Sequence, residues 1–234
     1  MSPRRAPATA TAPVVLEVGK KRTFASALDW PGWSRSARTS DGEEGALAAL
    51  DAYAARYAAV ADSAGCRAAF ANVTGPGGPA WTIVDRVDGD ATTDFGAPSR
   101  PSTVEDAPLT APEAARTIAL LDGCWRMLDS VAAKAPQTLR KGPRGGGRDR
   151  DAVVAHVVRA EASYARKLGL REVATPDPSD PDQVEQLRTR IRDELTPALV
   201  AATVGEPRRW SARYVVRRMA WHVLDHAWEI EDKG

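Results

Sequence analysis

The chain holds three histidines, and their spacing is its clearest sign of chemistry. His222 and His226 are four residues apart in a segment with helical periodicity, so both rings leave the same helix face one turn apart. His156 occupies an inward position of an earlier periodic segment. Three imidazoles that converge on a divalent ion leave a coordination position open for water or substrate, as in catalytic zinc sites. Histidines at this spacing also occur where they only pack, so the sequence leaves both interpretations open.

Two acids near the histidine pair are the candidates for a catalytic role. Glu229 lies three residues after His226 and could reach the metal or orient an imidazole, and Asp225 could do the same for His222. Either could equally be a surface acid near a helix end. The intervening sequence HVLDH has Val223 where H-E-x-x-H zinc peptidases place their general base. Peptidase activity is therefore disfavoured.

Other charged residues near the histidines are expected to serve packing or solvation. Glu161, five residues after His156, should point off the histidine face towards a neighbouring helix or an arginine. Arg217 and Arg218 could bind an anionic substrate, but we expect them to be solvated beside the acids at 229–232.

Four segments with the periodicity of amphipathic helices must position these residues. The first begins at residue 110, the second covers 151–168, the third begins after residue 182, and the fourth covers about 211–231. Four such helices with polar outer faces are enough for a bundle.

The ends of these helices are marked by recognisable residues. Thr110 and Glu113 form a capping box at the start of the first helix. Gly169 is suited to end the second, because glycine readily adopts the left-handed conformation found after helix ends. Pro197 is expected to kink or shorten the third.

The first half of the chain alternates shorter segments. Strands are predicted over 14–18, 23–28 and 34–39, a helix over 40–61, further strands over 68–73 and 80–87, and a turn-rich linker over 89–108. The predicted organisation is a disordered tail (1–13), an α+β domain (14–67), strands and a linker (68–109), and an all-α four-helix bundle (110–234).

Composition limits the classes of partner. The 234 residues carry a formal net charge of +1, which gives no electrostatic case for nucleic acid or an anionic membrane. No apolar run approaches the roughly 20 residues that span a bilayer, and the first residues lack the apolar core of a secretory signal. Cys66 and Cys124 have no motif spacing, so we expect unpaired thiols in a reducing cytoplasm.

Part of the first half resembles a known family. The sequence ALDWPGWSRSARTSDGEEGALAAL, within a β-β-β-α order over residues 14–65, resembles HicB-type domains, in which a strand runs into a D-x-P-G turn and a helix begins with paired acids. The resemblance implies the fold of that domain. It does not imply the antitoxin or interaction roles of the family, because no toxin partner or DNA-binding appendage is evident.

The second half resembles another family. AVVAHVVRAEASYARKLGL and RYVVRRMAWHVLDHAWEIED are similar to the second and last helices of DinB-like (YfiT-like) proteins. This resemblance covers residues 110–234 and implies a bundle, often dimeric, that binds a divalent metal through His156, His222 and His226. Some relatives are transferases or isomerases that use a low-molecular-weight thiol such as mycothiol or bacillithiol. The long N-terminal unit departs from the usual layout of the family.

Two hypotheses of different classes follow. In the first, the protein binds a divalent metal, with zinc ahead of nickel, iron or copper, and acts on a small molecule as a metal-dependent hydrolase or thiol-dependent transferase. In the alternative, it is a non-catalytic dimerisation or interaction module whose metal site is structural or vestigial. The sequence does not decide whether the protein is an enzyme.

Overall fold

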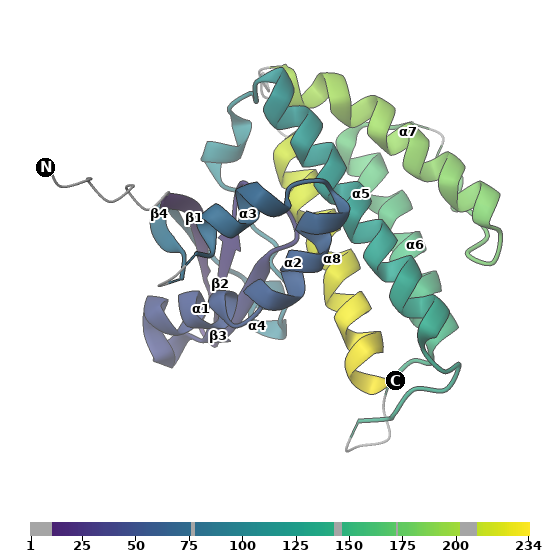
Figure 1. The fold of residues 1–234 in the computed structure, drawn as a ribbon, viewed down its shortest axis with the longest axis horizontal. Helices are drawn as coiled ribbons and strands as arrows, with labels where there is room; N and C mark the ends of the chain where they lie inside the picture. The colour runs from purple at the N-terminus through teal and green to yellow at the C-terminus, as the bar shows by residue number, and fades with distance from the viewer. Residues whose placement is uncertain (1–10, 76–77, 143–146, 172, 202–209) are drawn as a thin grey trace, which may run out of the picture.

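A four-stranded sheet precedes a run of helices in the computed structural model of the protein, which describes residues 11–75, 78–142, 147–171, 173–201 and 210–234 (Figure 1). The strands are β1 (Thr11–Val18), β2 (Arg22–Ala27), β3 (Ser34–Arg38) and β4 (Ala80–Asp88). The helices are α1 (Gly42–Asp51), α2 (Ala54–Ser63), α3 (Arg67–Val73), α4 (Ala91–Phe95), α5 (Ala111–Lys134), α6 (Arg150–Leu168), α7 (Pro181–Val200) and α8 (Ala212–Lys233), with short 3-10 turns at Thr39–Asp41 and Thr103–Asp106. The fold is α+β, as the sequence predicts.

β1 is an inner strand of the sheet, whose order is β3-β2-β1-β4. It runs antiparallel to β2 and parallel to β4. Val14, Val15 and Leu16 are all buried, which fits a strand covered on both faces. β1 begins at Thr11, earlier than predicted. The rest of the predicted tail, residues 1–10, lies outside the described part of the chain.

The predicted helix over 40–61 is wrong in one respect, because it is divided into α1 and α2. The Leu50 carbonyl accepts hydrogen bonds from the Trp33 indole (2.8 Å) and from the Tyr53 amide (3.1 Å). The bond from Tyr53 spans three residues rather than four, which tightens the last turn and ends α1.

The predicted strand over 68–73 is also wrong, since this segment forms α3. A short apolar run does not distinguish a strand from a helix, and three of these six residues are alanines, which favour helix. As a helix the segment buries Phe70 against Trp30 and Trp33, with ring centroids 4.9 and 5.1 Å apart. The strand predicted over 80–87 is confirmed as β4.

The predicted linker over 89–108 contains short capped helices. Asp90 caps α4 and Ser102 caps the turn at Thr103–Asp106. That turn carries Glu105, which is buried against Arg217 of α8. The segment therefore anchors α8 as well as connecting two parts of the chain.

The four long helices match the predicted segments closely. The capping box of Thr110 and Glu113 starts α5, and Gly169 ends α6 in the left-handed conformation. α7 continues to Val200, so Pro197 does not shorten the helix. α5 and α6 both pack against α8, and α7 packs against α5 and α6.

α8 lies between the sheet side of the molecule and the other long helices (Figure 1). One apolar core contains residues from β1, α1, α5 and α8. Gly32 follows β2 with a positive φ of 92°, and a Cβ there would lie 2.7 Å from a methyl group of Leu224. The glycine therefore permits close contact between the D-x-P-G turn and α8.

No described helix is both long and apolar enough to cross a bilayer. Cys66 and Cys124 are free thiols, as expected. Burial raises the pKa of the Cys124 thiol, so this group stays protonated.

Candidate metal centre

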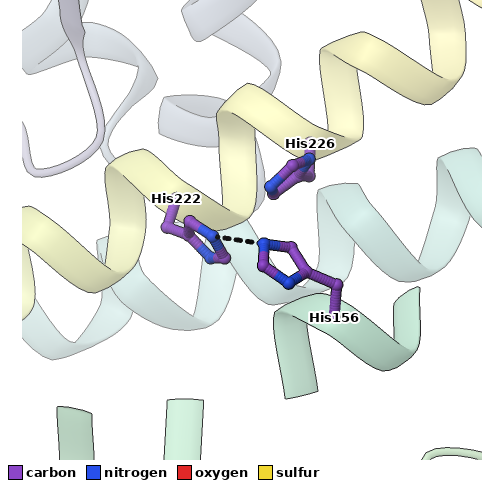
Figure 2. A group of neighbouring side chains, drawn as sticks. All are labelled: His156, His222 and His226. Atoms are coloured by element: carbon purple, nitrogen blue, oxygen red, sulfur yellow. Dashed lines mark hydrogen bonds between the residues drawn. The ribbon is translucent and has the colours of Figure 1, made fainter. Parts of the chain in front are cut away.

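The three histidines meet between α6 and α8. His156 extends from α6, and His222 and His226 extend from successive turns of α8, so the rings face one another (Figure 2). One potential ligand atom from each residue lies within 4.8 Å of those of the other two. Ring centroids are 4.6 to 5.0 Å apart. The structure thus brings together all three residues that the sequence singled out.

One spacing between ring nitrogens is close to that of a zinc site. The Nε2 atoms of His156 and His222 are 3.2 Å apart. Two nitrogens bound to tetrahedral zinc at about 2.0–2.1 Å are separated by about 3.3 Å. A hydrogen bond between two imidazoles would explain this one distance, but it gives no reason for the third ring. The residues present therefore fit a divalent ion.

Burial favours the neutral form of these imidazoles, which is the form that binds metal. Loss of solvent is the largest cause that lowers the pKa of His222 to about 2, and the nearby charges of His226 and Arg218 add to it. Burial, followed by the charge of His226, also lowers the pKa of His156. Both rings are neutral at physiological pH and keep a lone pair for a ligand bond.

Glu229 orients the ring of His226. Its carboxylate accepts a hydrogen bond from Nδ1 of His226 at 2.7 Å and another from Lys233 at 2.6 Å. The bond from His226 is the main reason that the pKa of Glu229 falls to about 2. With its proton on Nδ1, His226 has Nε2 free to bind an ion, which is the arrangement of metal-binding histidines backed by a carboxylate.

Asp225 has a different neighbour. Its carboxylate accepts a hydrogen bond at 3.1 Å from Arg35 of β3. The Arg35 guanidinium also lies 3.8 Å above the ring of Tyr53. Among the described residues, no hydrogen bond joins Asp225 to His222. The structure therefore places Asp225 in the contact between β3 and α8.

Arg217 is not solvated, contrary to the expectation from sequence. It is buried, and its guanidinium donates to both carboxylate oxygens of Glu105 at 2.6 and 2.8 Å. The partner lies in the segment interpreted as a linker, so no local pattern could identify it. Glu161 behaves as expected, because it is buried and faces Arg188 of α7 at 3.5 Å.

Two further residues lie beside the histidines: Tyr164, which the sequence did not link to the site, and Arg218, which was an anion-binding candidate but was predicted to be solvated. Tyr164 of α6 has its ring centroid 5.8 Å from that of His222. Arg218 of α8 contacts the rings of Tyr164 and Trp221. The signal was available in the helical spacing, because Tyr164 is two turns after His156 and Arg218 is one turn before His222.

Comparison of the chain with protein-family models, with curated proteins and with solved structures found no match. The description of the site therefore depends on its own geometry.

Proposed function

We propose that this protein binds a divalent metal through His156, His222 and His226 and acts on a small molecule. The hypothesis includes a DinB-like four-helix bundle formed by α5 to α8. The observation that carries it is the convergence of three imidazole ligand atoms within 4.8 Å between two helices. The reaction class is metal-dependent hydrolysis or thiol-dependent transfer.

The chain's own groups would have distinct tasks. The three imidazoles would hold the ion, and Glu229 would keep the ring of His226 in the orientation and tautomer that binding requires. Three protein ligands leave room for one more, as in catalytic rather than structural zinc sites. A bound divalent ion supplies Lewis acidity that activates a water or a thiol at neutral pH. Zinc is the first choice, and imidazoles also accept nickel, iron or copper.

A structural role for the metal is the second candidate. It is favoured by the position of the ligands, because an ion held by α6 and α8 would join these two helices. A structural ion would raise the thermal stability of the protein but would not bind added thiol. A site with an open position would do both, so the absorption spectrum of the cobalt-loaded protein with and without thiol separates the two roles.

Metal analysis of purified, reloaded protein is the primary test. We expect about one divalent ion per chain in the wild type and little in a His222→Ala, His226→Ala double variant. The matched control is Arg190→Ala, Glu194→Ala, which has the same spacing on an exposed face of α7 and should keep the metal. Equal, negligible metal in all three proteins would contradict the proposal.

A further inference from the structure

Tyr164 of α6 and Arg218 of α8 lie next to the histidines on the facing sides of these two helices. On α8, Arg218, His222 and His226 follow one another at four-residue intervals and so share a face. On α6, Tyr164 shares the face of His156. Because the Tyr164 ring lies beside both His222 and Arg218, these side chains border one region next to the candidate metal centre.

Arg218 has an unusual environment for a half-buried arginine. Its guanidinium carbon lies 4.5 Å from the centroid of the Trp221 ring and 5.4 Å from that of Tyr164. Within the described residues it has no hydrogen bond or ion pair, and its Nη1 atom is buried without a partner. The aromatic rings hold the group in place through cation–π contact but use none of its N–H donors.

The adjacent Arg217 provides a comparison, because its side chain has a structural role in the fold. Arg217 is paired with a carboxylate through two nitrogens. Arg218 lies between two rings and has no hydrogen-bond partner in the described part of the chain, so it has the features of a group that binds an anion from outside the chain.

The surrounding charge favours an anionic ligand as well. Arg148 and Arg159 lie close enough to His156 to act on it electrostatically, and Glu229 is the acid that opposes them there. Glu229 itself is engaged by His226 and Lys233. A divalent ion held by three neutral imidazoles would add two positive charges, leaving the region with a clear excess of positive charge.

We propose that Arg218 binds an oxyanion group, a carboxylate or a tetrahedral oxyanion, of the same small molecule whose other end occupies the open metal position. Tyr164 and Trp221 flank the Arg218 guanidinium. The inference rests on the proposed metal site and adds a substrate class to it.

Binding of small thiols to the cobalt-loaded protein tests this inference without an activity assay, because thiolate coordination changes the cobalt spectrum. The probes are 3-mercaptopropionate, with a carboxylate, and 2-mercaptoethanesulfonate, with a tetrahedral oxyanion. The neutral control is 3-mercaptopropionamide. In the wild type we expect one or both charged thiols to bind about 10- to 100-fold more tightly than the amide, the range of a hydrogen bond to a charged group. The tighter of the two identifies the oxyanion.

The variant Arg218→Met should reduce this preference to about threefold or less while leaving affinity for the amide unchanged. Arg190→Met, on an exposed face of α7, is the matched control and should keep the preference. If Arg218→Met takes up no cobalt, Arg218→Gln carries the same expectation with a polar, planar end.

Cobalt uptake without a preference for charged thiols would overturn this inference and leave the proposed metal site intact. A preference that persists without the Arg218 guanidinium, or that disappears equally in the Arg190 control, would also overturn it. Failure of the wild type to take up cobalt would remove both proposals.

Discussion

α8 carries two buried polar clusters, which differ in whether the chain supplies hydrogen-bond partners for their polar atoms. In the arginine cluster, Arg217 donates to Glu105 through two nitrogens, to the Arg100 carbonyl at 3.0 Å and to the Ser26 hydroxyl at 3.4 Å. In the histidine cluster, by contrast, Nδ1 of His222 is buried without a partner among the described residues. The first cluster is satisfied by the chain itself. The second is left incomplete, because the described part of the chain offers Nδ1 of His222 no partner and its Nε2, the atom that would bind an ion, faces only Nε2 of His156.

The largest expected effect comes from breaking the satisfied cluster. Arg217→Met leaves the Glu105 carboxylate buried without its partner, which should lower the free energy of unfolding by about 3–5 kcal/mol. Urea denaturation monitored by circular dichroism measures this. Adding Glu105→Leu should restore much of the loss, because the unpaired charge is then gone. A change below about 1 kcal/mol in the single variant would mean that the cluster is not satisfied internally.

In metal-free protein, the histidine cluster should make the free energy of unfolding depend on pH. Since burial holds the pKa of His222 near 2, the unfolded chain takes up a proton below pH 6.5 that the folded chain does not. The contribution of His222 to the free energy of unfolding is therefore fully present above pH 6.5. It is lost as pH falls, by about 2 kcal/mol between pH 8 and pH 5. Urea denaturation with chelator present at each pH should show this slope, and His222→Leu should reduce it. An unchanged slope in the variant would contradict the assignment.

A smaller effect should follow from disturbing the orientation of a ligand. Glu229→Gln removes the negative charge that faces Nδ1 of His226 and should weaken zinc binding at least about tenfold, or about 1.4 kcal/mol. Competition with a chromophoric chelator gives the dissociation constants. Glu231→Gln is the matched control, because Glu231 pairs with Arg56 on another face and should not affect the metal. Equal affinities in the two variants would remove Glu229 from the site.

The smallest effect is expected at the contact between β3 and α8. Asp225→Asn removes a partly exposed ion pair with Arg35 and should cost about 0.2–1 kcal/mol of stability. Zinc affinity should change less than about twofold, because the carboxylate faces Arg35. A tenfold loss of zinc affinity would instead restore Asp225 as an orienting partner of His222.

The elements that were predicted well depend on local patterns. Periodicity and caps located the long helices because an amphipathic stripe and a capping box are contained within one segment. His156, His222 and His226 could be singled out for the same reason, since each has an inward position on its own helix. Glu229 was a sound candidate because it lies one turn from His226.

The features that were missed depend on distant residues. The short apolar run of the α3 segment does not distinguish strand from helix, and the packing partners of Phe70, which are Trp30 and Trp33, lie far earlier in the chain. The burial of Arg217 depends on Glu105, which is 112 residues away in a turn-rich stretch. Asp225 faces Arg35 across 190 residues. No spacing rule contains such pairings, because they arise only when the sheet packs against α8.

The same distances bear on folding kinetics. α8 contacts Ser26 and Arg35 from almost the opposite end of the chain, and contacts so remote in sequence slow folding. α8 must pack against α6 before His222 and His226 can meet His156. An ion that binds only the assembled triad would stabilise the whole folded state, by about 2.7 kcal/mol at a concentration 100 times its dissociation constant. Such an ion would therefore stabilise the sheet against unfolding without contacting it.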